Sequence, residues 1–374
     1  MLREHGKGET AQTKRKAGGD MRTLLLSGLT ICAVLLAAGQ ASRAQSVENF
    51  YRGKTVRFIV GSNTGGSYDT YSRLLATHMG RHIPGNPSIV VENMPGASGT
   101  KSAQYIGEIA PKDGSVIGMF NQSMPQRQMF EPDQVQFDLS KFGWIGAMNT
   151  STTVFITWHT SGVKTLEDAK KKEVVMGALS ATGGNSVYPL LINAFLGTKF
   201  KVVLGYQGGN TIQLAMERGE VDGRAAVVWS GLKAGWPHWI AEKKISVLLQ
   251  TGLAKEPDLP DVPLLLDLAN NPEEKAIFRF VSSDSAMGFP VAAPPGIPAD
   301  RLAALQKAFS DTMKDPEFLK IATERKLEIE PSTGQDVKKV VEDLISTPKD
   351  VIAKIKKGLA EAEAQAAQGA KAKQ

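Results

Sequence analysis

The sequence predicts an α/β protein built from two lobes. Short apolar runs with β-forming residues alternate with helix-like segments over most of the chain, which is typical of parallel βαβ units. About 330 of the 374 residues remain behind an N-terminal export segment. A chain of that length exceeds what one hydrophobic core usually supports, so we expect two lobes.

The first 44 residues have the order of an export signal. Arg22 precedes the apolar run 24–39, and small residues follow up to Ala44. We expect cleavage after Ala44, with 1–20 as a long basic region or an extension upstream of Met21. The alternative is an uncleaved membrane anchor, but the apolar run is shorter than the roughly 20 residues that a spanning helix needs.

Charge and cysteine content exclude several classes of function. The formal charge is +6, but residues 1–44 hold seven Lys/Arg and three Asp/Glu, which leaves 37 basic and 35 acidic residues. Such a balance argues against nucleic acid as a partner, because binding it normally needs a concentrated basic face. The single cysteine, Cys32, lies in the export segment, so disulfides, thiolate catalysis and cysteine-bound metal are not expected.

The elements follow one another in a regular order. In the first part of the chain, strands are predicted at 55–60, 88–91 and 115–120, with helices at 69–81 and 99–109. In the second part, strands are predicted at 173–179, 202–204, 221–229 and 245–249, with helices at 187–196 and 211–218. Amphipathic helices at 300–314, 316–326 and 336–359 close the chain, followed by a frayed low-complexity tail. We assign 45–148 plus 252–374 to lobe 1 and 149–251 to lobe 2.

Motifs of the common enzyme and metal sites are missing from the sequence. It has no Walker-type loop, complete dinucleotide fingerprint or nucleophile elbow, so no cofactor and no enzymatic activity are expected. His78 and His82 have the spacing of a metal pair, but no acidic residue lies between them as in zincins. We therefore predict no metal, with these histidines on the surface or paired with a helix end.

Three glycine turns, each between a strand and a helix, are the main functional signal. They read VGSNTGGSYD, LSATGGNSVY and LGYQGGN. Glycine lets the backbone approach a ligand, and the helix N-terminus that follows suits an anion. None of the loops contains Lys or Arg, which favours a carboxylate held by amides and hydroxyls over a phosphate clamped by arginine. The alternative is that Gly-Gly only makes a tight turn.

The candidate ligand-binding residues lie in these turns. They are Ser62, Asn63, Thr64, Gly65, Gly66, Ser67 and Tyr68 in the first turn, Ser180, Thr182, Gly183, Gly184, Asn185 and Ser186 in the second, and Tyr206, Gly208, Gly209 and Asn210 in the third. Asp69 and Arg73 stand four apart at a helix start and are predicted to form a structural pair.

Several of these segments also carry a resemblance to a known family. The segments are YRGKTVRFIV, GGSYDTYSR, IVVENMPGASGT, APKDG, the YQGG turn with its following GEVDG, DLPDVP, and APPGIPADRLAAL with its following DPEF. Together they resemble the Bug-type solute receptors of tripartite tricarboxylate transporters over nearly the whole mature chain. The resemblance implies a two-lobed Venus-flytrap with type II periplasmic binding protein topology, and membrane transporter subunits as partners.

The resemblance also implies where a solute binds. In the family, the first two glycine turns hold the carboxylate of the ligand, partly through trapped waters, which falls on 62–67 and 180–186 here, with 206–210 nearby. The chain departs from the family where Pro-Phe is usual at the first turn, where Thr182 replaces Gly and where Tyr188 replaces His. The identity of the ligand therefore does not carry over.

These observations predict a periplasmic receptor without enzymatic activity. It would capture a mono-, di- or tricarboxylate between its lobes and deliver it to a membrane transporter. Two alternatives remain at this point: a ligand sensor that feeds a signalling partner, and an exported hydrolase.

Overall fold

The structure, a computed structural model, describes residues 47–133, 135–150, 152–181 and 183–371. The predicted export signal and its cleavage site at Ala44 lie outside the described residues. Within these ranges, none of the helices is both long and apolar enough to cross a membrane.

The first sheet has six strands. In spatial order they are β11 (Ser332–Thr333), β4 (Gly143–Asn149), β10 (Gly288–Ala293), β3 (Val116–Met119), β1 (Thr55–Val60) and β2 (Ser88–Asn93). Strand β1 pairs in parallel with β2 and β3, as expected for βαβ units. Strand β10 is antiparallel to both β3 and β4, so the sheet is mixed.

The second sheet has five strands and repeats the same plan. In spatial order they are β7 (Phe200–Val203), β6 (Val174–Gly177), β8 (Gly223–Val228), β5 (Thr153–Trp158) and β9 (Ile245–Thr251). Strand β6 pairs in parallel with β7 and β8, whereas β5 is antiparallel to β8 and β9. In each sheet the antiparallel inner strand, β10 or β5, follows a crossing of the chain from the other sheet.

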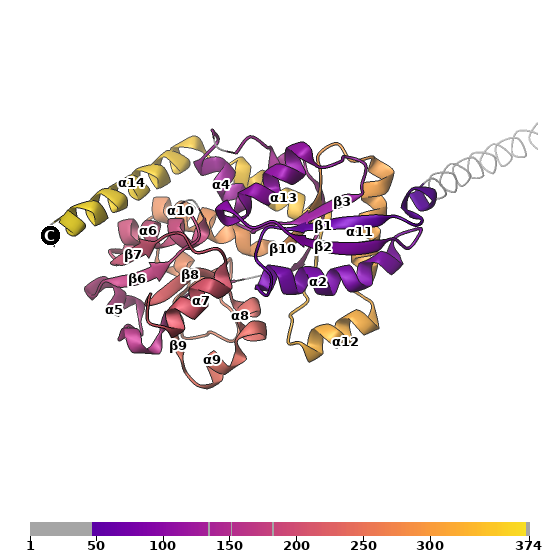
Figure 1. Cartoon of the computed structure of the whole chain (residues 1–374). Helices are drawn as coiled ribbons and strands as arrows, with labels where there is room; N and C mark the ends of the chain where they lie inside the picture. Colours follow the sequence, from indigo (N-terminus) through magenta and orange to yellow (C-terminus); the bar gives the residue numbers. More distant parts are fainter. Residues whose placement is uncertain (1–46, 134, 151, 182, 372–374) are drawn as a thin grey trace, which may run out of the picture.

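The two sheets form separate lobes joined by these crossings (Figure 1). One crossing leads from β4 to β5, and the other leads from β9 back to β10. Thr153 and Thr251 face each other at the register where β5 meets β9, and their hydroxyls are hydrogen-bonded. The two segments that enter and leave the second lobe are thus tied together where they meet the cleft.

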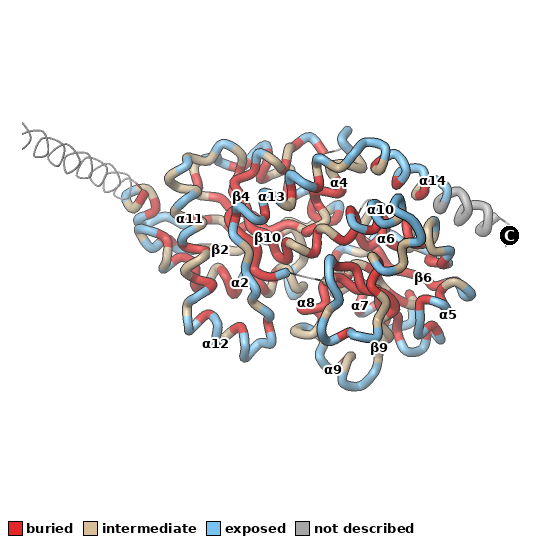
Figure 2. Tube along the Cα trace, turned by 180° about the vertical axis from the view of Figure 1, so that it is seen from behind, coloured by how far each residue is buried: buried red, intermediate tan, exposed pale blue. Residues whose placement is uncertain are grey.

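Helices cover both faces of the two sheets. They are α2 (Ser67–Met79), α3 (Thr100–Gln104), α4 (Met124–Phe130), α5 (Leu166–Lys171), α6 (Gly184–Leu196), α7 (Gly209–Glu217), α8 (Trp229–Gly235), α9 (Pro237–Ala241), α10 (Pro272–Ser282), α11 (Ala299–Thr312), α12 (Pro316–Glu324), α13 (Gly334–Ile345) and α14 (Lys349–Lys371). Helix α2 buries Tyr71, Leu74, Leu75 and Met79, which recur at helical spacing along one face. Buried residues gather on the strands of both sheets, as Figure 2 shows.

One expected helix is divided in two. The periodicity over 336–359 predicted a single helix, but α13 ends at Ile345 and α14 begins at Lys349. Pro348 stands between them, and a residue before proline is disfavoured in the helical conformation, which explains the break. Helix α14 continues to Lys371, through the segment that was expected to fray.

Helix α14 also lies on the second lobe. An added Cβ at Gly358 would stand 3.2 Å from the ring of Phe195 on α6. Phe195 in turn contacts Phe278 of α10 edge to face, at 6.1 Å between ring centres. Parts of 252–374 therefore pack against lobe 2, and the exact lobe boundaries stay a prediction.

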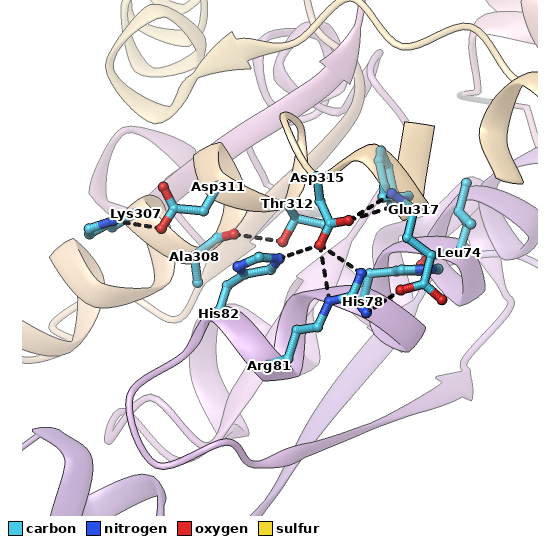
Figure 3. A network of polar contacts seen from close by, with 11 residues as sticks. Leu74, His78, Arg81, His82, Lys307, Ala308, Asp311, Thr312, Asp315 and Glu317 are labelled. Atoms are coloured by element: carbon cyan, nitrogen blue, oxygen red, sulfur yellow. Dashed lines mark hydrogen bonds and ion pairs between the residues drawn. The ribbon is translucent and has the colours of Figure 1, made fainter. Parts of the chain in front are cut away.

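The two histidines of the metal-like pair contact other protein groups (Figure 3). His78 is buried, its Nδ1 lies 3.0 Å from the carbonyl oxygen of Leu74, and its ring packs edge to face on Phe318. The Nε2 atom of His82 lies 2.8 Å from Asp315. Within the described ranges, no group of three His, Cys, Asp or Glu side chains is placed to hold a metal ion.

Asp315 fastens α12 to the end of α2. Its carboxylate accepts hydrogen bonds from the first backbone amides of α12 and from Arg81 and His82 (Figure 3). Burial raises the pKa of Asp315, but the hydrogen bonds from His82, Arg81 and the helix backbone outweigh it and hold the pKa well below its usual range. This contact lies within lobe 1 and keeps α2, which starts at the cleft, in place.

Candidate functional site

A small cavity lies between the two sheets, where the three glycine turns converge. It encloses about 90 Å³. One water needs roughly 10–15 Å³ by this measure, so the space suits a solute of on the order of six to nine heavy atoms. The predicted residues that line it are Ser62, Gly66, Ser67, Tyr68, Gly184, Asn185, Gly208, Gly209 and Asn210.

The remaining predicted residues surround the cavity without lining it. They are Asn63, Thr64, Gly65, Ser180, Gly183, Ser186 and Tyr206. Thr182 lies outside the described residues. Several of them connect the lobes or shape the turns: the Ser186 hydroxyl donates to the carbonyl oxygens of Ser180 and Gly183, at 2.6 and 2.8 Å.

The turns of the two lobes touch each other directly. The hydroxyls of Ser98 in lobe 1 and Ser180 in lobe 2 are 2.7 Å apart and hydrogen-bonded. The Asn210 side-chain amide donates to the carbonyl oxygen of Thr64 at 3.3 Å. An added Cβ at Gly183 would stand 2.3 Å from the Ser98 hydroxyl oxygen, so this turn has no room for a side chain. The cleft is therefore closed around the cavity.

Asp69 and Arg73 brace the first turn. Arg73 approaches both oxygens of the Asp69 carboxylate at 2.9 Å. The same carboxylate accepts from the Gly65 amide at 2.9 Å and from the Asn93 side chain at 2.8 Å. Burial raises the pKa of Asp69, but the bonds from Arg73, Gly65 and Asn93 outweigh it and keep the pKa below its ordinary value. Neither residue lines the cavity.

An arginine that the sequence reasoning missed lies in the cavity wall. Arg224 stands on β8, outside the glycine turns, in the otherwise small and apolar run GRAAVV. The register of β8 against β5 shifts between Arg224 and Val227, and Ala226 there has a φ of 51°. Such a bulge re-aims side chains, and it brings Arg224, Ala226 and Val227 to the same cavity. The sequence reasoning considered only the three loops, which contain no Lys or Arg, and therefore did not include Arg224.

Arg224 has no ion-pair partner among the residues that the structure describes. Its Nε is buried with no hydrogen-bond partner, and among the described residues no carboxylate is within ion-pair distance of the guanidinium. Burial lowers the pKa of Arg224 to about 10, so it stays charged at neutral pH. Arg224 as a whole is half-buried at the cavity. A partly buried charge without an ion-pair partner favours an anion beside it, which indicates that an anion completes this site.

The third turn places a helix N-terminus beside that guanidinium. Gly209 is the first residue of α7, and an added Cβ there would stand 2.6 Å from Nη1 of Arg224. The N-terminus of a helix carries a partial positive charge and free amides, so it adds to the positive potential of the arginine. Both features attract an anion to the same place.

A buried carboxyl lies on the lobe 1 side of the cavity. Asp284 is 1% exposed and accepts a hydrogen bond of 2.8 Å from the hydroxyl of Tyr188. Burial raises the pKa of Asp284 to about 7, although the hydrogen bonds from Tyr188 and Gln122 act against it. Tyr188 lies in α6, directly after the second turn, at the position where the resemblance implies histidine. Its hydrogen bond to Asp284 ties the second turn to this carboxyl.

The remaining wall is partly polar, with Ser98, Asn121, Gln122, Ser123, Thr153 and Gln213, and partly apolar. Its larger apolar side chains are Met119, Leu179, Val227, Val228, Leu232 and Trp236. The described lining thus offers one full positive charge, one carboxyl that titrates near neutral pH, several neutral donors and an apolar side. This arrangement can bind a small solute that has one anionic end.

Comparison with known proteins decides the family. Residues 72–357 match the family described as "Tripartite tricarboxylate transporter family receptor". The chain belongs to this family. A UPF0065 protein of Cupriavidus necator is 23% identical over 344 residues, which cover 89% of this chain and 97% of that protein. A second UPF0065 protein, from Agrobacterium vitis, is 24% identical over 78% of this chain and 82% of its own length.

Several solved structures have the same fold. The periplasmic binding protein BugD superposes with a TM-score of 0.65 at 18% identity, covering 82% of this chain and 98% of BugD. MatC of Rhodopseudomonas palustris, solved with malate, superposes with a TM-score of 0.63 at 18% identity, covering 80% of this chain and 99% of MatC. Rpa4515 of R. palustris, solved with adipate, superposes with a TM-score of 0.63 at 18% identity, covering 81% of this chain and 97% of Rpa4515. The predicted family and the two-lobed type II binding-protein fold are confirmed.

Proposed function

We propose that the protein is a periplasmic receptor that closes its two lobes around one small carboxylate and delivers it to a tripartite membrane transporter. The observation that carries the proposal is Arg224, a half-buried cation that stands beside the N-terminus of α7 and has no ion-pair partner among the described residues. A carboxylate supplies the missing charge and can pair with the guanidinium through two parallel hydrogen bonds.

The rest of the cavity supports this choice of ligand. The lining contains the N-terminal turns of α2, α6 and α7, whose free amides suit an anion. Phosphate would bring up to two charges to a wall that has one arginine, whereas a monocarboxylate, or one end of a longer acid, matches it. MatC and Rpa4515 were solved with carboxylates, which agrees with this class of ligand.

We further propose that the receptor does not transform its ligand. The ionisable side chains in the described lining are Arg224, Asp284 and the phenol of Tyr68. The carboxylate of Asp284 accepts a hydrogen bond from Tyr188. Such a wall binds a ground-state anion and has no group placed to favour a transition state. The role in transport is supported by the family to which the chain belongs.

A thermal-shift experiment tests the proposal. The purified mature protein is heated with a panel of mono-, di- and tricarboxylates and with the amide of each acid as a neutral control. A matching carboxylate at 100 times its dissociation constant should add about 2.7 kcal/mol to the free energy of unfolding. The amide should add far less, and the acid should be recovered intact. Equal stabilisation by acid and amide, or turnover of the acid, would contradict the proposal.

A further inference from the structure

A second hollow adjoins the cavity on the outer side of the same cleft. It measures about 450 Å³, against about 90 Å³ for the inner cavity. Its walls come from the start of α2, from α8 and the turn into α9, and from the segment 324–327 that ends α12. In Figure 1, α8 lies on the side of the second lobe that faces α2. Ser67 and Trp236 line both spaces and therefore stand between them.

Ser67 and Trp236 together form the partition between the inner cavity and the outer hollow. Within it, Trp236 is held in a fixed position. Its amide donates to the carbonyl oxygen of Leu232 at 2.8 Å, and Pro237 directly behind it disfavours continued helix. Its indole packs against that of Trp239, with 6.1 Å between ring centres. Trp239 is 1% exposed and donates to Glu217 at 3.0 Å, so it is a firm support. The Trp236 ring is thus braced from behind.

Ser67 completes the partition from the other lobe. It is the first residue of α2 and faces Gly231 of α8, where an added Cβ would stand 2.3 Å from the Ser67 hydroxyl oxygen. The two helices can approach this closely only because residue 231 is glycine. Since Ser67 belongs to lobe 1 and Trp236 to lobe 2, the partition is complete when the lobes are closed.

We propose that Trp236 sets the length of the solute that the closed receptor accepts. This inference rests on the proposed function and specifies its ligand as a short-chain carboxylate. The acid group pairs with Arg224, and the chain end stops at the indole of Trp236. A longer chain would have to pass into the outer hollow, which the partition blocks.

The test compares chain-length series between variants. Straight-chain mono- and dicarboxylates, from acetate and malonate upward to octanoate and suberate, are titrated by calorimetry against wild type and Trp236→Ala. Wild type should bind the short members of a series and lose at least tenfold in affinity beyond a limiting length. Trp236→Ala should bind the longer members at least tenfold more tightly than wild type does, because the two spaces become one.

Two further variants serve as controls. Trp236→Phe keeps a ring in the partition and should retain the length limit of wild type. Leu232 is buried and lines the inner cavity but not the outer hollow, so Leu232→Ala adds space without opening the partition. It should not admit the longest acids. The same length limit in wild type and Trp236→Ala, or the same gain in Leu232→Ala, would overturn the role of Trp236. If wild type bound no acid of either series but bound another carboxylate of the panel, the length limit would be overturned and the proposed function would stand. If it bound no carboxylate at all, the proposed function itself would fail.

Discussion

The first and third glycine turns have the same Gly-Gly pair but use it for different reasons. In the first turn, Gly65 has a φ of 83°, which side chains other than glycine rarely adopt, and an added Cβ there would meet nothing within 4 Å. In the third turn, Gly209 has no such backbone, but an added Cβ would stand 2.6 Å from Arg224. The first turn needs glycine for its backbone, and the third needs it for space beside a cation.

The difference shows that the third turn, and not the first, is coupled to Arg224, the cation that would pair with the ligand. At Gly66, an added Cβ would have the carbonyl oxygen of Asn63 as its nearest neighbour at 3.6 Å, an ordinary contact. The first turn can therefore bind through amides and hydroxyls and tolerate a methyl group at position 66. In the third turn, the position of the guanidinium depends on the missing side chain of Gly209.

Paired alanine variants test this contrast most strongly. Gly209→Ala should push the guanidinium of Arg224 away from the N-terminus of α7 and weaken carboxylate binding tenfold to a hundredfold, about 1.4–2.7 kcal/mol. Gly66→Ala should change the affinity by less than about threefold. Calorimetry with one carboxylate measures both, and thermal unfolding checks that both variants fold. Equal losses in the two variants would remove the distinction between the turns.

An effect of pH on stability is expected through Asp284, the buried carboxyl that lines the same cavity as Arg224. The pKa of Asp284 is about 7 in the folded protein but about 4 in an unfolded chain. Between these values the folded state binds the additional proton, so the free energy of unfolding should fall as pH rises from about 4 to about 7. Asp284→Asn should flatten this part of the profile, measured by denaturant unfolding at several pH values.

The same carboxyl should affect binding. Above pH 7 the ionised Asp284 adds a negative charge to the cavity wall, while Arg224, whose pKa is about 10, stays charged. Carboxylate affinity should therefore drop by a few-fold between pH 6 and pH 8 in wild type and stay level in Asp284→Asn. A profile that is as steep in the variant as in wild type would assign the titration to another group.

The order of many elements could be predicted from the sequence, because those strands and helices have a clear local pattern. Strand β1 was predicted over its observed bounds, and the three turns were placed between the correct strands and helices. The strands β4, β5 and β10 were not predicted. They are buried along their whole length, so the alternation that marks a half-buried strand is missing from them.

The candidate site could be predicted only as far as it is local. Nine of the residues proposed from the turns line the cavity. Arg224 and Asp284 also line it, but they belong to elements outside the glycine turns in the sequence. Their participation depends on a strand bulge and on the return of the chain to lobe 1, which are tertiary features. A lone arginine inside the small, apolar run GRAAVV was the one local signal that could have pointed to β8.

The central claim is that the half-buried guanidinium of Arg224, which has no ion-pair partner among the described residues, pairs with the carboxylate of the solute. Its most direct test is Arg224→Gln, measured for affinity by calorimetry and for ligand-free stability by thermal unfolding. The account predicts at least a 30-fold loss of affinity, about 2 kcal/mol. It also predicts an unchanged or higher free energy of unfolding without ligand, because the substitution breaks no ion pair among the described residues and removes a partly buried charge. Carboxylate binding at wild-type affinity in Arg224→Gln would contradict it.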